Sequence, residues 1–139
     1  MLKIKIGSKE FEYVDALETE EFYNGASRRT LAVNCPSDAI GLDELNALLT
    51  EENLAEITMT NTEGIPVYTE ITEEGVQEID HYDPIVNTVV GYVLKISCGI
   101  TSVLAQPETP DTPAVYEEQV VFKVAKRTYI EEQLHKLGL

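Results

Sequence analysis

Residues 21–31 read EFYNGASRRTL, and the Asn24-Gly25 pair at their centre decides how the N-terminal part of the chain folds. An Asn-Gly pair between two strand-like runs is the best short-range signal for a β-hairpin, because both turn residues need a positive φ. With a two-residue loop, Tyr23 lies opposite Ala26, and every pair further back along the two strands is then fixed. The stretch therefore predicts an antiparallel hairpin of defined register.

The same register decides what two consecutive arginines do in an otherwise acidic chain. Counting back from the turn, Glu21 falls opposite Arg28. Glu20 falls opposite Arg29, so we predict two cross-strand ion pairs, each worth about 0.2–1 kcal/mol. Neighbouring strand residues point to opposite faces, so the two arginines cannot clamp one phosphate together. We predict a charge-stapled hairpin tip that projects toward a neighbouring subunit, and not an anion-binding loop.

On both sides of this hairpin, polar and apolar residues alternate as they do in strands. Strands are expected at residues 2–6, 10–23, 28–35, 55–61, 85–100 and 115–129, with two short strands around a turn at Glu74-Gly75. Pro66 has no N–H to donate, which places its segment at a sheet edge, and Gly91 marks a bulge or bend. Three prolines make residues 105–114 an extended loop.

Two segments have helical spacing instead. Repeated leucines predict a helix at about residues 42–50, which must lie on a sheet because so short a helix is unstable alone. Ile130, Leu134 and Leu137 predict a C-terminal helix. We therefore expect one mostly β (α+β) domain, residues 1–139, with about seven antiparallel strands in a barrel or sandwich, a short helix after strand three and a C-terminal helix.

The chain is strongly acidic, with 25 Asp and Glu against 10 Lys and Arg and a formal net charge of −15. A field of that sign repels nucleic acids and anionic membranes, so we expect neither as a partner. The charge fits either simple solubility or an acidic docking surface. The N-terminus lacks the apolar run of a signal peptide, and Cys35 and Cys98 are too few for a disulfide framework, so a cytoplasmic site of synthesis is expected.

The sequence contains no motif for catalysis or metal binding. His81 lies between Asp80 and Asp83, but alternation sends His81 and Asp80 to opposite faces of a strand, which favours a solvated turn. His135 has no ligand partner one helical turn away. Adjacent glutamate pairs face apart, so they do not form a catalytic pair. We therefore predict that the protein is not an enzyme and has no metal or cofactor.

Two features have competing interpretations. Residues 123–127, KVAKR, either contact an acidic neighbour, including another copy of this protein, or pair internally with Glu117 or Glu118, which we prefer. The seven tyrosines either pack in the core and at its rim, which we again prefer, or form an exposed sugar-binding face. The candidate protein-contact residues are Asn24, Gly25, Arg28, Arg29, Lys123, Lys126 and Arg127.

The order of elements resembles that of a known family. The hairpin return NGASRRTLAV, the short helix GLDELNALL, the strand AEITMTN and the closing helix RTYIEEQLHKL follow a first strand pair. Together they are similar to the small β-barrel proteins of tails and baseplates encoded by phages and prophages of Firmicutes. The resemblance covers most of the chain as architecture, but the loop QPETPDTP does not match that pattern.

The resemblance implies a structural protein of the virion, a subunit that rings or bridges the tail tube and baseplate through extended hairpins. Its expected partners are other tail proteins and further copies of itself, in a homo-oligomeric assembly, and the family supplies no catalytic residues. A carbohydrate- or surface-binding β module is the alternative, favoured by the tyrosines and the acidic loops.

Overall fold

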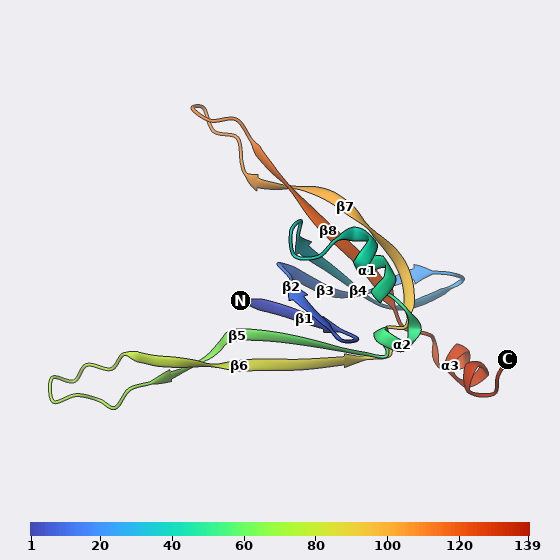
Figure 1. Ribbon diagram of the computed structural model, residues 1–139, viewed down its shortest axis with the longest axis horizontal. Coiled ribbons are helices and arrows are strands. Elements are labelled where there is room, and N and C mark those ends of the chain that lie inside the picture. The colour runs from blue at the N-terminus through green and yellow to red at the C-terminus, as the bar shows by residue number, and fades with distance from the viewer.

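The structure, a computed structural model, describes all residues 1–139 and contains two antiparallel four-stranded sheets and three helices (Figure 1). Sheet A has the strand order β2-β1-β5-β6, and sheet B has the order β3-β4-β8-β7. The strands are β1 (Leu2–Ile6), β2 (Lys9–Glu12), β3 (Asp15–Tyr23), β4 (Ala26–Pro36), β5 (Glu56–Tyr68), β6 (Ile79–Val90), β7 (Leu94–Gln106) and β8 (Val115–Ala125). The helices are α1 (Leu42–Leu48), α2 (Glu51–Leu54) and α3 (Tyr129–Lys136).

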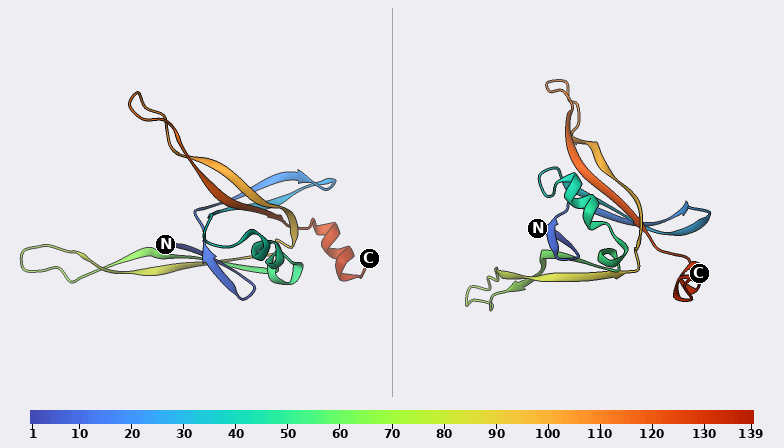
Figure 2. Two further views of the ribbon diagram at one scale, coloured as in Figure 1. Left: turned by 45° about the horizontal axis from the view of Figure 1, so that its top comes forward. Right: turned by 45° about the vertical axis from the view of Figure 1, so that its right-hand side comes forward.

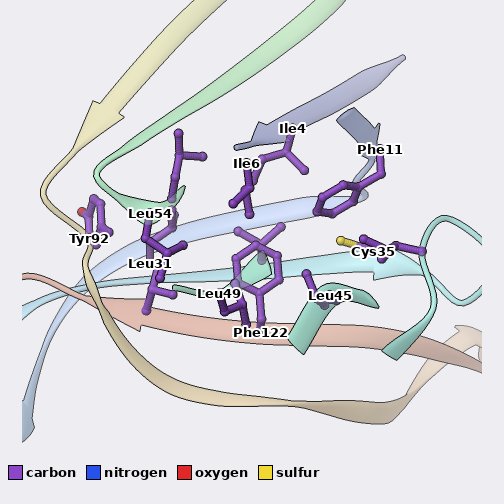
Figure 3. Close-up of a cluster of buried hydrophobic side chains, with 14 of the residues drawn as sticks. Ile4, Ile6, Phe11, Leu31, Cys35, Leu45, Leu49, Leu54, Tyr92 and Phe122 are labelled. Atoms are coloured by element: carbon purple, nitrogen blue, oxygen red, sulfur yellow. The ribbon is translucent and has the colours of Figure 1, made fainter. Parts of the chain in front are cut away.

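The two sheets and the first two helices enclose a small hydrophobic core. Its side chains come from the inner faces of β1, β4, β5 and β8 and from α1 and α2, and they point toward one another (Figure 3). Phe122 of β8 and Leu45 of α1 are fully buried in it. Only 20 of the 139 residues are buried, so much of this chain lies outside any core.

The expectation of a mostly β fold is confirmed, and the arrangement is sandwich-like, since the sheets do not close into a barrel. The prediction of about seven strands was wrong, since the structure has eight. Two of the six longer predicted strands are each divided, while the two short strands expected around Glu74-Gly75 belong to β5 and β6. Residues 10–23 break after β2, where the chain crosses from sheet A to sheet B. Residues 85–100 break at Gly91, whose positive φ of 84° lets the chain leave sheet A for sheet B.

The predicted helix at 42–50 is confirmed as α1, and a second helix, α2, follows it directly. Thr50 caps α2 by accepting a hydrogen bond from the Asn53 N–H at 3.3 Å. Both helices follow the fourth strand and not the third, because the division of residues 10–23 adds one strand before them. Their leucines reach the core, as so short a pair of helices requires.

β5 extends seven residues beyond the strand predicted at 55–61, whereas β8 ends at Ala125, four residues before the end of the strand predicted at 115–129. β5 and β7 have 13 residues each, and the two short strands expected around Glu74-Gly75 are the distal ends of β5 and β6. Pro66 does lie at an edge, since β1 pairs with β5 only as far as Asn61. The proline-rich loop joins β7 to β8, as expected.

Two hairpins therefore extend beyond the sandwich as two-stranded ribbons that diverge from one another (Figures 1 and 2). We name residues 62–83 the β5–β6 arm, because there β5 and β6 pair only with each other. Residues 102–118 are the β7–β8 arm, because β4 pairs with β8 no further than Gln119. α3 lies at the opposite end of the molecule from the β5–β6 arm in every view.

Candidate functional site

The hairpin at Asn24-Gly25 folds as the sequence predicts. Asn24 has a φ of 51° and Gly25 a φ of 84°, the pair of positive values that a two-residue turn requires. Tyr23 pairs with Ala26, and the register continues unbroken to the far end of β3. The prediction of the register is confirmed.

The ion pairs predicted for the two arginines were wrong, although the strand partners are right. Glu21 and Arg28 face each other across the ladder. The Arg28 guanidinium nevertheless pairs with Glu131 of α3, at 2.6 Å between Nη1 and Oε1. The Arg28 side chain is only 1% exposed and also donates to the backbone carbonyls of Tyr23, Asn24 and Lys126. Arg28 is thus an internal anchor for the C-terminal helix.

Arg29 differs from Arg28 in both its exposure and its ion-pair partner. Its side chain is about half exposed and donates to Glu18 at 3.2 Å, one cross-strand diagonal away from the predicted Glu20. Consecutive strand residues face opposite ways, so the two arginines do not share one surface. The hairpin tip therefore holds no paired cationic site.

The cations of residues 123–127 are mostly paired within the chain, as preferred, but not with Glu117 or Glu118. Lys123 takes the carboxylate that Arg28 leaves free, since its Nζ lies 2.9 Å from Glu21. Lys126 lies over the ring of Tyr92, with 4.9 Å from Nζ to the ring centroid.

Arg127, the last of these cations, belongs to the attachment of α3. Its guanidinium lies 2.6 Å from Glu51 of α2 and 3.8 Å from Glu132 of α3. His135 Nε2 lies 3.1 Å from the same Glu51 carboxylate. Together with Arg28–Glu131, these are the ion pairs that attach α3, and no residue of the helix is buried.

The N-terminus of α3 is well defined by a capping box. The Thr128 hydroxyl accepts from the Glu131 N–H, and the Glu131 carboxylate accepts from the Thr128 N–H at 2.9 Å. The hydrogen bond from Arg28, with that from Thr128, lowers the pKa of Glu131 from 4.5 to about 2. A carboxylate with a lowered pKa stabilises the folded state above its ordinary pKa, and the effect is lost as pH falls.

Acid is therefore expected to release α3 before the rest of the protein unfolds. Between pH 4.5 and about 2, protonation of Glu131 removes its ion pair with Arg28, and Glu51, whose pKa Arg127 also lowers, acts in the same direction. The amide chemical shifts of residues 129–136 should move toward random-coil values over that range. Glu131→Gln should show the same displacement at pH 7, and α3 shifts that are unchanged down to pH 2 would contradict this attachment.

The β5–β6 arm displays apolar side chains with nothing over them. Tyr68 and Ile79 face each other across the ribbon and both are about half exposed. Tyr82 is exposed as well, and Val86, which lies four residues later on β6 and just beyond the arm, is exposed on the same face. The same arm carries seven acidic residues and no lysine or arginine.

The β7–β8 arm repeats this combination on a smaller scale. Leu104 and Tyr116 are cross-strand partners and are both more than half exposed. Its acids are Glu108, Asp111, Glu117 and Glu118, again without a lysine or arginine. Both arms are therefore apolar and acidic at once.

The tyrosine expectation was wrong for four of the seven residues. Only Tyr92 is fully buried, while Tyr68, Tyr82, Tyr116 and Tyr129 are exposed. Three of these four lie on β5, β6 and β8 where the arms run, so the reason is the length of the strands beyond the core.

His81 also differs from the prediction that it would face away from Asp80. A register shift between Val67 and Tyr68 breaks the alternation, and His81 Nδ1 lies 2.6 Å from the Asp80 carboxylate. Asp83 lies 3.4 Å from Nε2, and hydrogen bonding to Asp80 raises the pKa of His81. All three side chains are exposed on the arm.

A shallow hollow of about 430 Å³ lies between α2 and α3 and contains the His135–Glu51 pair. Both side chains are about half exposed, and the carboxylate also accepts from Arg127. The pair thus belongs to the attachment of α3. No group of three His, Cys, Asp or Glu side chains has the arrangement of a metal site.

Sequence reasoning found the hairpin tip but missed the arms and the role of Arg28. The β5–β6 arm could have been recognised from the long acidic stretch between residues 62 and 94, which contains no lysine or arginine. The partner of Arg28 could not be recognised in this way, because Glu131 lies 103 residues further along the chain.

No family model, no curated protein and no solved structure matches this chain. None of its helices is both long and apolar enough to cross a membrane.

Proposed function

We propose that the protein is an assembly subunit of a phage tail or baseplate and acts by contacting neighbouring proteins through its two arms. The observation that carries the proposal is that both arms leave the sandwich as two-stranded ribbons with exposed apolar side chains. No second layer of this chain covers either ribbon. Such a surface is typical of a contact that another protein completes.

The physical argument concerns the stability of the ribbons. A two-stranded hairpin is at best marginally stable in water, because it has no core of its own. Leu104 and Tyr116, or Tyr68 and Ile79, gain burial only when a partner packs on them. Before a partner binds, the acidic side chains around these pairs keep the arms soluble. The same side chains favour a partner whose surface is both apolar and basic.

The sheets also offer backbone contacts. β6 is one of the two edge strands of sheet A and β7 one of the two edge strands of sheet B, so each leaves a row of N–H and C=O groups without a strand partner. Proteins that assemble through extended hairpins add a neighbour's strand to such an edge. The assignment to a tail or baseplate is supported by the resemblance in the order of elements, and the virion is then the place where the protein works.

The proposal is tested by measuring binding to the tail and baseplate proteins encoded beside this gene and by light scattering at increasing concentration. We expect self-association or binding to at least one tail protein. We expect the double variant Leu104→Ser and Tyr116→Ser to weaken it about tenfold or more, as loss of apolar interface anchors does. Leu17→Ser, an exposed leucine outside the arms, is the matched control and should leave binding unchanged.

A protein that remains a monomer at its highest soluble concentration and binds none of those tail proteins would contradict the proposal. Circular dichroism of the variants separates a lost contact from a lost fold.

A carbohydrate-binding module is the second candidate, because exposed tyrosines lie close together on one arm. Tyr82 of β6 is the cross-strand partner of Pro66 of β5. Tyr68 lies two residues after Pro66 on β5, so the rings of Tyr68 and Tyr82 project from the same face of the ribbon. Flat aromatic faces of this kind stack on sugar rings. A glycan array is the decisive measurement: hits that Tyr68→Ala abolishes would favour this candidate, and an empty array removes it.

A further inference from the structure

The sandwich has two sides at which its sheets end, and these two sides differ in charge. On one side lie the edge strands β2 and β3, joined through residues 13–14, and seven of the fifteen residues from 9 to 23 are charged. On the other side lie the edge strands β6 and β7, joined through residues 91–93. Of the 24 residues from 84 to 107, only Lys95 is charged, although a quarter of the whole chain is. The β6–β7 side of the sandwich is therefore almost free of charge.

Exposed sheet edges are normally protected, because their free N–H and C=O groups can pair with a strand of another molecule. Charged side chains, prolines and very short strands are the usual protection. β2 has only four residues, β3 carries four acids, and β6 contains Asp80, Asp83 and Pro84. Residues 96–106 of β7 include neither a charged residue nor a proline, so β7 is the least protected edge strand of the protein.

The regular part of β7 is long enough to accept another strand. Residues 97–104 pair with β8 without a break, between one register shift at each end. Lys95 lies outside that stretch, and its ammonium donates to Asn46 of α1, so it does not guard the edge. Ile100, in the middle of the stretch, is 58% exposed. A strand added here would pair with eight uncharged residues and cover an apolar side chain.

Charge also indicates which molecule supplies the added strand. Two copies of a chain with a net charge of −15 repel each other, but salt screens charges separated by more than about 8 Å, so the charges nearest a contact decide its strength. The edge of β7 brings no like charges together. A basic partner gains no attraction from this uncharged stretch, whereas it does gain attraction from the acids of β3 and of the arms. The strand that best matches β7 is therefore β7 of a second copy.

Antiparallel pairing of β7 with itself restricts the register. Cross-strand partners lie on the same face of a sheet, so the two-fold axis between identical strands must pass a residue that faces its own copy. The middle of the regular stretch offers Ile100 and Thr101. With the axis at Ile100, the two exposed isoleucines cover each other, whereas an axis at Thr101 places Ile100 opposite Ser102. The burial of apolar surface therefore favours Ile100 as the self-facing residue.

We propose that β7 of one copy pairs antiparallel with β7 of a second copy, centred on Ile100, so that sheet B continues through both molecules as eight strands. The inference rests on the proposed assembly function and names the partner of one sheet edge as a second copy of this chain. The same surface is used on both copies, so the contact closes as a two-fold dimer. A single pair of strands buries less area than a standard interface, so the dimer forms at high protein concentration.

Charges introduced at residue 100 test the pairing, because that residue faces its own copy. Ile100→Glu and Ile100→Lys each place two like charges opposite each other, so each variant alone should dimerise about tenfold more weakly than the unmodified protein, or not at all. Mixed in equal amounts, the two variants place opposite charges across the axis and should dimerise more tightly than either alone. Analytical ultracentrifugation measures the dissociation constants, and circular dichroism verifies that the variants fold, as the exposure of this position allows.

Leu17→Glu and Leu17→Lys are the matched controls, at an exposed leucine on β3 on the other side of the sandwich, and both should dimerise as the unmodified protein does. If either Ile100 variant alone dimerises as well as the unmodified protein, β7 is not the contact and the inference fails, while self-association and the proposed function stand. A mixture that dimerises no better than its components also overturns the inference. If the unmodified protein is always monomeric, the inference fails, and binding to tail proteins then decides the proposed function separately.

Discussion

Phe122→Ala is expected to lower the free energy of unfolding by about 3–5 kcal/mol, as the loss of a buried aromatic side chain does. Phe122 is 0% exposed and lies at the centre of the core, between Leu45 of α1 and the side chains of sheet A (Figure 3). The small core has few other contacts with which to compensate for the cavity. Since whole domains are stable by only about 5–15 kcal/mol, this loss is a large fraction of the total stability of the protein.

Phe22→Ala is the matched control, because the same substitution is made on β3 at a side chain that is 77% exposed. Its effect should be within about 0.5 kcal/mol. Urea unfolding followed by circular dichroism measures both variants. A loss of less than 1.5 kcal/mol for Phe122→Ala, about half the expected minimum, would show that the two sheets do not share the core described.

The features that could be predicted from the sequence are those that depend on residues close together in the chain. The register of β3 and β4 was predictable because the Asn24-Gly25 turn fixes it within a few residues. α1 was predictable because its leucines repeat at helical spacing over a single short segment. Both depend on residues that are neighbours in sequence.

Features that depend on distant residues could not be predicted in the same way. Arg28 pairs with Glu131 and not with its cross-strand neighbour Glu21, because α3 lies beside the hairpin. No sequence pattern near residue 28 indicates where α3 lies. The contact between His81 and Asp80 depends on a register shift against β5. The separation of β2 from β3 follows from the chain moving to the other sheet. The spacing of Phe11, Tyr13 and Leu17 in the sequence suggests one continuous strand, but in the structure Leu17 is exposed.

The candidate site was predicted in part for the same reason. Residues 123–127 were correctly singled out as charged and as mostly paired internally, but Glu21, Glu51 and Glu132 replace the acids that are nearest in sequence. The arms were missed because alternation marks strands, while it does not say whether a second layer covers them. A long strand with acids and apolar residues on both faces is the pattern that would have indicated an uncovered ribbon.

Arg28→Ala is the substitution with the second largest expected effect, at about 2–4 kcal/mol of unfolding free energy. The guanidinium is buried and satisfies the carbonyls of Tyr23, Asn24 and Lys126 as well as the Glu131 carboxylate. Its loss leaves these acceptors without a donor in a partly buried site. The same change detaches α3, because the ion pair with Glu131 is the attachment at the start of that helix.

Arg29→Ala makes the same substitution one residue later and should cost no more than about 0.5–1 kcal/mol, since its pair with Glu18 is exposed. Both substitutions remove one positive charge. The difference between their effects on the free energy of unfolding therefore measures the effect of burial and not of charge. Thermal unfolding gives the stability, and the α3 amide shifts give the position of the helix. If the two variants have equal effects, the hairpin tip is merely a solvated surface after all, and Arg28 does not connect it to the C-terminal helix.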